Sequence, residues 1–368
     1  MTKTTTLMAV IGSILIIAFV GSMAQQTFRE YMSQQDEEYN KYVKAEQKAF
    51  AKYKADVEKK WNEFIDATRR DWVEYSSDLN TLSDVDFEDG KITIETIVEK
   101  NNPDIMGQAA KNISDKIADL FQVDSLADEV VLANLVEFNS PPIIDSTNAR
   151  LFADEKVIPG ATLDRETIMS QDGIERVKIT ATFKMVPDHI KIRAERYLPA
   201  VKKYCMKYDV ELPLVMAIMQ TESYFNPRAK SPIPAYGLMQ LVPRSGAREA
   251  YRFVHKEDKI VKPDFLYTPE NNIHLGCAYI AKMRDNEFKD VKDPEKLRYC
   301  LIAAYNTGPG NVCHAVAGEK SLRPTIEEIN FMERETLFRI LTEELPYQET
   351  KDYLVKVETR RDYYNEWK

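Results

Sequence analysis

A glutamate at the end of an apolar segment is the residue best suited to do chemistry. Residues 212–221 (LPLVMAIMQT) are almost entirely apolar, Pro213 suits the first turn of a helix, and Glu222 and Ser223 follow directly. A helix that is apolar on all sides is buried. A carboxyl group at the end of such a helix loses hydration, which raises its pKa. The segment therefore predicts a general acid that keeps its proton near neutral pH.

Further motifs follow Glu222 in a fixed order. Along the chain come Asn226-Pro227, Ser231, and the runs YGLMQ (236–240), AYNTG (304–308) and PYQETKDY (346–353). This ordered set resembles the lytic transglycosylase family with a lysozyme-like soluble-lytic-transglycosylase domain, whose marks are Glu-Ser, Gly-Leu-Met-Gln, Ala-Tyr-Asn and a terminal Glu-Thr…Tyr. The resemblance is most specific in residues 205–315 and extends more weakly over 25–368.

The resemblance implies a reaction for Glu222. In such enzymes the glutamic acid protonates the oxygen that bridges MurNAc and GlcNAc in peptidoglycan glycan strands. It then takes the proton of the MurNAc 6-hydroxyl, which closes a 1,6-anhydro ring and consumes no water. No cofactor and no metal are expected.

The resemblance also implies substrate contacts for seven further residues. Ser231 would hold the N-acetyl group, and Tyr305 would hydrogen-bond the reacting carboxyl from the opposite side of the cleft. Ser223 has an alternative role as a support of the Glu222 helix. The complete set of expected substrate-binding residues is Ser223, Ser231, Met239, Gln240, Tyr305, Asn306 and Tyr353.

The count of carboxyl groups bears on the type of reaction. A glycosidase that hydrolyses its substrate normally uses two carboxyl groups. The motifs place no second carboxylate beside Glu222, and Asp209 and Glu211 precede the helix as expected surface groups. The leading hypothesis is therefore a peptidoglycan lyase. Two alternatives stay open: a lysozyme-type hydrolase on the same fold, and a peptidoglycan-binding tether with incidental activity.

All these motifs lie in a segment without strand patterns. From Asp188 to the C terminus the chain reads as successive helices, and prolines fall near the expected boundaries, at 213, 243, 269, 294 and 346. We expect a lysozyme-like, all-helical domain over 188–368. The fold class expected for the whole chain is α+β: a long N-terminal helix, a small α+β domain, and then this helical catalytic domain.

The expected α+β domain covers residues 78–187. Apolar residues alternate on both sides of Asp89-Gly90, which predicts a hairpin. A helical pattern follows over 102–121, a break falls at 139–142, and a strand over 177–185 ends before Pro187.

Residues 25–77 predict one long, charged helix. The whole segment contains no Gly or Pro, and aromatics recur every 11 residues, from Phe28 to Trp72 and from Tyr31 to Tyr75. Eleven residues over three turns keep both sets on one helix face. Such a thin stripe needs a partner, which could be the following domain, a second copy of the chain through self-association, or a membrane surface.

The N-terminal 24 residues predict export. An apolar run, 7–20, follows Lys3, and the small residues Ser22 and Ala24 suit a signal-peptidase site, so 1–24 is a signal peptide or a signal anchor. No cysteine lies near it, which argues against a lipoprotein anchor. Together with the resemblance, this predicts the periplasm of a Gram-negative bacterium, with membrane association through this segment.

The bulk composition excludes one class of partner. The net charge is −9 and the composition is that of a globular protein, with 44% hydrophobic and 30% charged residues. Such an acidic chain lacks the basic surface of a nucleic-acid binder. The four cysteines match no zinc pattern. Three of them lie in segments with a helical pattern, where a buried thiol is the expected state and a disulfide the alternative.

Overall fold

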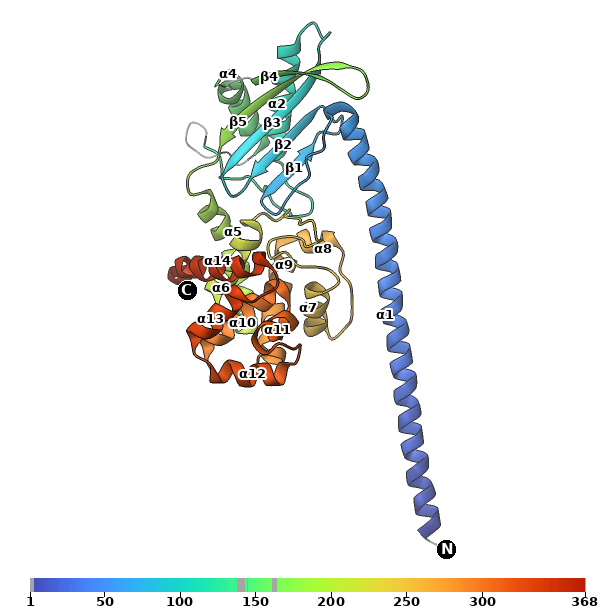
Figure 1. Ribbon diagram of the computed structural model, residues 1–368. Helices are drawn as coiled ribbons and strands as arrows, with labels where there is room; N and C mark the ends of the chain where they lie inside the picture. The colour runs from blue at the N-terminus through green and yellow to red at the C-terminus, as the bar shows by residue number, and fades with distance from the viewer. Residues whose placement is uncertain (1–2, 138–142, 144, 161–163, 368) are drawn as a thin grey trace.

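The computed structural model describes residues 3–367 except 138–142, 144 and 161–163. It has a long N-terminal helix, an α+β domain and a helical domain, so the predicted fold class is confirmed (Figure 1). The long helix runs from the sheet past the helical domain toward the N terminus. The break expected at 139–142 lies outside the described residues.

The sheet of the α+β domain has five antiparallel strands in the order β1-β2-β3-β5-β4. Strands β2 and β3 form the predicted hairpin, and Gly90 in its turn has a left-handed φ of 63°. The predicted long strand is also confirmed as β5. The bounds are β1 Asp71–Tyr75, β2 Thr81–Asp86, β3 Lys91–Glu99, β4 Asp164–Met169 and β5 Glu175–Lys184.

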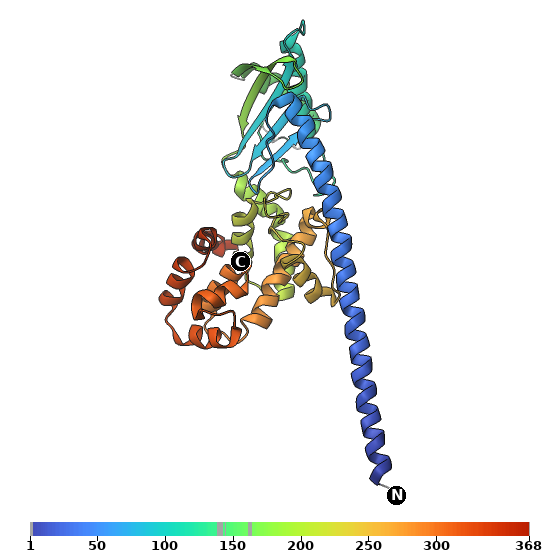
Figure 2. The ribbon, with the colours of Figure 1, turned by 45° about the vertical axis from the view of Figure 1, so that its right-hand side comes forward.

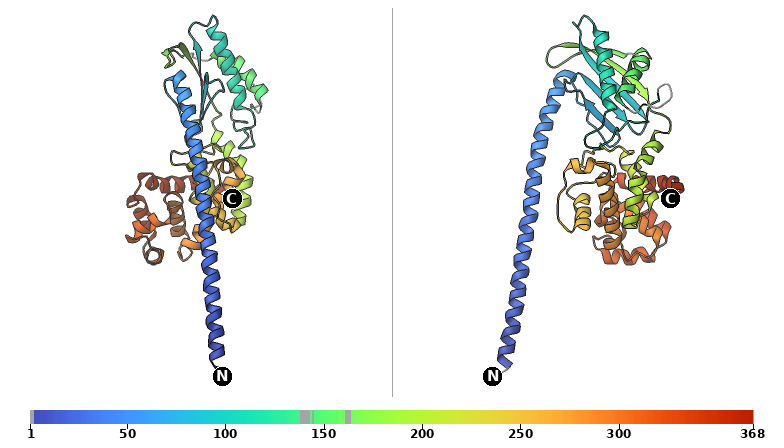
Figure 3. Two further views of the ribbon diagram at one scale, coloured as in Figure 1. Left: turned by 90° about the vertical axis from the view of Figure 1, so that its right-hand side faces the viewer. Right: turned by 180° about the vertical axis from the view of Figure 1, so that it is seen from behind.

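Helices cover both faces of this sheet (Figure 3). The predicted helix α2 (Ile105–Leu120) packs its apolar side, including Ile113 and Ile117, on one face. The end of helix α1 (Lys3–Trp61) places Val57 and Trp61 on the other. Between β3 and β5 the chain also forms α3 (Ser146–Phe152), the π-helical turn Ala153–Val157 and α4 (Ile158–Gly160). Because strand residues alternate between the two faces, the sheet has a core on each side.

Helix α1 corrects one prediction. The helix expected over 25–77 starts earlier and ends at Trp61, where Asn62 adopts a left-handed φ of 68°. Trp72 and Tyr75 lie in strand β1 instead. The aromatic repeat continues across the turn because the sheet buries these residues too, so the repeat could not reveal where the helix ends.

The aromatic stripe of α1 packs on the rest of the chain. Tyr39 is only 7% exposed, and the Arg244 guanidinium lies 4.9 Å over its ring. Lys262 covers Tyr42 in the same way, at 5.1 Å. Figure 2 shows α1 passing alongside the helical domain at this level. Among the partners expected for the stripe, the structure therefore shows the chain's own domains.

Residues 188–367 are helical, as predicted, and contain no strand beyond isolated bridges in this described stretch. Their core surrounds α6 and contains Cys205, Cys277 and Cys300, and all four cysteines are buried free thiols. The helices are α5 His189–Tyr208, α6 Leu212–Ser223, α7 Gly246–His255, α8 Pro263–Tyr267, α9 Pro269–Lys282, α10 Pro294–Thr307, α11 Pro309–Ala317, α12 Leu322–Phe331, α13 Arg334–Glu343 and α14 Gln348–Tyr364. A π-helical turn (Met283–Glu287) follows α9, and a 3-10 turn (Asn365–Trp367) ends the described chain.

Candidate active site

Helix α6 brings Glu222 to the surface of the helical core. Pro213 stands in its first turn, and Tyr224 and Phe225 end it with left-handed φ values of 49° and 60°. Glu222 is 5% exposed. The fully buried Ser223 hydroxyl lies 3.0 Å from the Met219 carbonyl oxygen and 2.8 Å from that of Leu238. Ser223 thus fastens the helix end and does not face the substrate, so its expected substrate contact is wrong and its supporting role is confirmed.

Burial sets the protonation of Glu222. Loss of hydration raises the pKa of its carboxyl to about 7, while Tyr353 and Arg69 lower this pKa and the nearby charge of Glu349 raises it. The Tyr353 hydroxyl is buried and has no hydrogen bond of good geometry among the described residues, although it faces the Glu222 carboxyl. A carboxyl with this pKa is half protonated near neutral pH, as a general acid requires.

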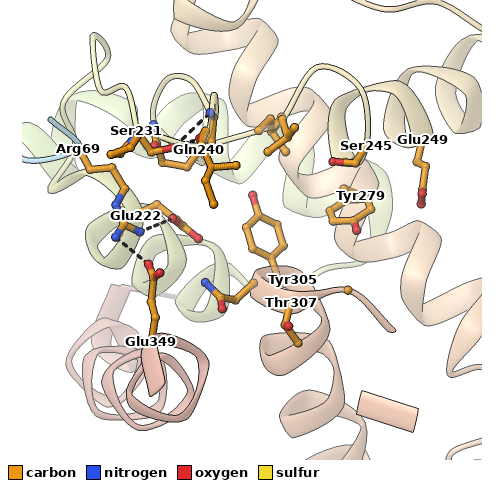
Figure 4. Close-up of a pocket in the computed structure, with 18 of the residues that line it drawn as sticks. Arg69, Glu222, Ser231, Gln240, Ser245, Glu249, Tyr279, Tyr305, Thr307 and Glu349 are labelled. Atoms are coloured by element: carbon orange, nitrogen blue, oxygen red, sulfur yellow. Dashed lines mark hydrogen bonds and ion pairs between the residues drawn. The ribbon is translucent and has the colours of Figure 1, made fainter. Parts of the chain in front are cut away.

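Two charged residues that the sequence analysis left out of the site lie beside Glu222. One Arg69 nitrogen (Nη1) is 3.8 Å from Glu222 Oε2, and the other (Nη2) is 2.7 Å from Glu349 Oε1 (Figure 4). Glu349 belongs to the terminal Glu-Thr…Tyr motif, which was the signal that could have found it. Arg69 lies in the loop between α1 and β1, outside every motif.

The expectation of no second carboxylate near Glu222 is therefore wrong. Glu349 reaches the site from the first turn of α14, a helix that packs directly on α6. Its charge is paired with Arg69, which distinguishes it from a free carboxylate that could activate water.

A cavity of about 600 Å³ opens from Glu222 into the helical domain. Four residues that the sequence analysis selected line it together with Glu222: Asn306, and Ser231, Gln240 and Tyr305, which Figure 4 labels. The sequence analysis missed Ser245, Tyr279 and Thr307, which line the same cavity. Met239 does not reach it, because its side chain is fully buried and packs where a Cβ on Gly276 would be. The substrate contact expected for Met239 is wrong.

Gln240 offers the cavity a hydrogen-bond acceptor. Its Nε2 donates to the carbonyl oxygens of Ala229, at 3.0 Å, and Gly237, at 2.9 Å. Both amide protons are thereby used, and the buried Oε1 has no partner among the described residues. This oxygen can accept a hydrogen bond from a substrate hydroxyl or amide N–H.

Tyr305 and Asn306 are held by neighbours rather than by Glu222. The Tyr305 hydroxyl donates to the Met239 carbonyl oxygen at 2.6 Å, so the expected hydrogen bond to the reacting carboxyl is wrong. Asn306 Oδ1 accepts from the Thr350 hydroxyl at 2.6 Å, which leaves its amide N–H groups for a ligand. Ser231 hydrogen-bonds within its own loop, donating to the Ile233 carbonyl and accepting from Ala235 N.

A second cavity, of about 500 Å³, adjoins Glu222 on the side of the α+β domain. Tyr353 lines this second cavity. Arg69, Glu222, Pro232 and Glu349 line both cavities, so the acid stands where the two meet. A polymer bound across this junction would have room for units on both sides of Glu222.

The helical fold and the buried Glu222 beside a cleft suit a transglycosylase of the soluble-lytic type, and comparison with known proteins shows this class. A family model described as the transglycosylase SLT domain matches residues 199–326, and another, for the N-terminal domain of membrane-bound lytic murein transglycosylase C, matches 35–196. The membrane-bound lytic murein transglycosylase C of Actinobacillus pleuropneumoniae serotype 5b (strain L20) is 34% identical over 300 residues, 77% of each chain. That of Serratia proteamaculans (strain 568) is 33% identical over 294 residues, 77% of this chain and 79% of the relative.

The chain therefore belongs to the membrane-bound lytic murein transglycosylase C family. Among solved structures it resembles an inactive mutant of the lytic transglycosylase Slt from Pseudomonas aeruginosa, with 24% identity and a TM-score of 0.36 over 46% of this chain. It also resembles the 70 kDa soluble lytic transglycosylase of Escherichia coli, with 25% identity and a TM-score of 0.35 over 46% of this chain. In both comparisons the match spans only 24% of the other chain.

Proposed function

We propose that this protein, a peptidoglycan lyase by family, cleaves the MurNAc–GlcNAc β-1,4 bond with Glu222 as both acid and base. The observation that carries the proposal is the buried Glu222 carboxyl, whose pKa of about 7 lets it exist in both protonation states at working pH. Its position at the junction of two cavities gives a strand access from both sides.

The reaction uses one proton in two steps. Protonated Glu222 first gives its proton to the bridging oxygen, and the bond to MurNAc C1 breaks as GlcNAc leaves with that oxygen. The Glu222 carboxylate then takes the proton of the MurNAc 6-hydroxyl while the oxygen of this hydroxyl bonds to C1. Glu222 ends protonated and the product is a 1,6-anhydro ring.

Neutral groups around the acid hold the sugars in this proposal. Gln240 Oε1 accepts a hydrogen bond, and the Asn306 amide donates one. Tyr353 lines the second cavity, where its hydroxyl, which faces the Glu222 carboxyl, can donate to a sugar that binds beside the acid. Ser231 can contact an N-acetyl group if its loop hydrogen bonds rearrange.

The lysozyme-type alternative would need a carboxylate that activates water, and Glu349 is the candidate. Its carboxylate is engaged by Arg69, at 2.7 Å, so a water bound at Glu349 would have to compete with this ion pair. The 6-hydroxyl is tethered to the reacting ring, so it has the rate advantage of an intramolecular nucleophile. These two arguments favour the lyase over the hydrolase, and the buried Glu222 with its raised pKa favours an enzyme over a tether.

Mass spectrometry of the released muropeptides tests the proposal. Products from purified sacculi should carry 1,6-anhydro ends, lighter by one water than lysozyme products and resistant to borohydride. Spectra dominated by reducible MurNAc ends would replace the lyase with the hydrolase. Sacculi that stay intact after exhaustive digestion would support the hypothesis of a peptidoglycan-binding tether.

The protein acts in the cell envelope, as its family indicates. We propose more specifically that residues 1–24 export it to the periplasm of a Gram-negative bacterium and associate it with the membrane until cleavage. None of the helices in the described part of the chain is long and apolar enough to cross a membrane. N-terminal sequencing of the protein from membrane and periplasmic fractions tests this export, since a start at Gln25 in both fractions would eliminate the anchor.

Self-association through residues 25–77 stays a prediction, which sedimentation velocity tests.

A further inference from the structure

The second cavity is walled by the two domains, and one face of α14 forms one of its walls. Glu349, Tyr353, Lys356 and Arg360 follow one another at intervals of four, three and four residues and all line it. This spacing places them on a single helix face. Arg69 and Arg70, from the loop after α1, line the same cavity. Four cationic side chains therefore surround a space that adjoins the acid.

The carboxylates in this cavity are already matched. Glu88 forms an ion pair with Arg70 and accepts a hydrogen bond from the Tyr224 hydroxyl. Arg360 donates to that same hydroxyl at 2.9 Å and lies 4.9 Å over the Tyr224 ring.

Apart from Glu222, two further carboxylates line the cavity, and both have partners. Asp71 accepts from the Thr68 hydroxyl at 2.6 Å, and Glu349 is paired with Arg69.

Lys356 has no such partner among the described residues. It is exposed on α14, and no hydrogen bond or ion pair holds its ammonium among the described residues. When Glu222 is protonated, the lining carries the four cations against the carboxylates of Asp71, Glu88 and Glu349. In that state the cavity has a surplus of one cation, in a chain whose net charge is −9. A local surplus of this kind attracts anionic ligands.

We propose that the cavity between the domains binds a carboxylate carried by the glycan strand, with Lys356 as its principal cation and Arg360 and Arg69 beside it. The inference rests on the proposed function, because the strand reaches this cavity only if it is cut at Glu222. Such a strand offers carboxylates of two sources: the lactyl group of a MurNAc without a peptide, and the stem peptide where one is attached.

Kinetics on three forms of the strand test the site. The first form carries stem peptides, the second is stripped to free lactyl carboxylates, and the third is stripped with these carboxyls converted to neutral methylamides. For each form we compare the KM of Lys356→Gln with the KM of the parent. This KM ratio should be roughly three- to tenfold larger on the carboxylate-bearing form that the site binds than on the neutral form, with little change in kcat. Lys356→Glu should enlarge this ratio, and 0.5 M salt should shrink it.

The three substrates distinguish the two sources. A raised ratio on peptide-bearing strands alone assigns the stem peptide, and a raised ratio on stripped strands alone assigns the lactyl group. Lys202→Gln is the matched control, because Lys202 is exposed on α5, lines neither cavity and changes the net charge equally. Equal KM ratios on all three substrates, or equal effects of the two lysine variants, would overturn the site. Failure of the proposed function appears separately, as reducible ends in the products of the parent enzyme.

Discussion

Two regions of the molecule approach the Glu222 carboxyl and act on it in opposite directions. Helix α6 belongs to the core of the helical domain and removes the carboxyl from water, which raises its pKa. The loop 62–70 runs over the surface of the α+β domain and brings Arg69, whose charge lowers that pKa. The core thus makes Glu222 an acid, and the loop limits how firmly the acid holds its proton.

The two regions are also held in place differently. Ser223 anchors the end of α6 through carbonyls inside the core. The loop is fastened by hydrogen bonds near its end, where Thr68 bonds Asp71 and the Lys230 N–H donates to the Thr68 carbonyl at 3.4 Å. Arg69 is 37% exposed while Glu222 is buried. Changes in the loop should therefore tune the reaction, and changes in α6 should abolish it.

The largest effect is expected from Glu222→Gln. The amide can neither give nor take the proton, so sacculus cleavage should fall by at least the roughly 10²–10⁴-fold typical of general acid–base catalysis. Glu211→Gln at the start of the same helix is the control, since Glu211 is exposed, is ion-paired with Arg361 at 2.9 Å and lines neither cavity. A Glu222→Gln enzyme that clears sacculi at the parental rate would remove Glu222 from the chemistry.

The next effect concerns the pH dependence of the parent enzyme. Only the protonated form of Glu222 can start the reaction, and its pKa is about 7. Above this pH, kcat/KM should fall about tenfold for each pH unit, because the protonated fraction of the free enzyme falls in that proportion. Rates on soluble glycan strands between pH 5 and 9 measure this limb. A flat profile across that range would contradict the protonation state assigned to Glu222.

Variants in the loop and in α14 should move this limb in opposite directions. Arg69→Gln removes a cation that lowers the Glu222 pKa, so the limb should shift to higher pH. Glu349→Gln removes an anion that raises it, so the limb should shift to lower pH. Tyr305 and Tyr353 also face Glu222 and stay in both variants. If Glu349→Gln instead abolished cleavage at every pH, Glu349 would be a catalytic base.

A smaller effect should appear in stability. The folded pKa of Glu222 is about 7 against an ordinary value of 4.5, so the folded state binds more protons between these two values. Stability contributed by the protonated carboxyl is therefore lost as pH rises through this window. Glu222→Gln escapes the loss, and its advantage in unfolding free energy should grow by about 2 kcal/mol from pH 5 to pH 8. Urea unfolding at both pH values measures this, and an advantage that does not grow would contradict the raised pKa.

The smallest effect is expected where α1 meets the helical domain. Tyr39→Ala removes a buried ring and its contact with Arg244, which should weaken the docking of α1 by roughly 1 kcal/mol. Hydrogen exchange in α7 and in the middle of α1 should become faster, while Gln47→Ala, on the exposed side, should leave it unchanged. Parental exchange in Tyr39→Ala would show that the ion pair of Arg248 with Asp36, at 3.2 Å, is sufficient for docking.

Several features follow from the sequence alone because their causes are local. The apolar run of α6, the alternation around Gly90 and the strand pattern of β5 each record which side of an element is buried, so periodicity predicted them. The order of the motifs likewise predicted four of the residues that line the first cavity together with Glu222. In each case neighbouring residues carry enough information to fix the element or the site.

Other features were decided only by the tertiary structure, because their causes lie far apart in the chain. Arg69 meets Glu222 and Glu349 only when the α+β domain packs on the helical domain. The Met239 carbonyl takes the Tyr305 hydroxyl away from the acid, and the core encloses Ser223 and Met239. The turn at Asn62 places Trp72 in a strand although the aromatic repeat continues. No local pattern records a contact between distant segments, so the charges that tune the acid became visible only once the chain was folded.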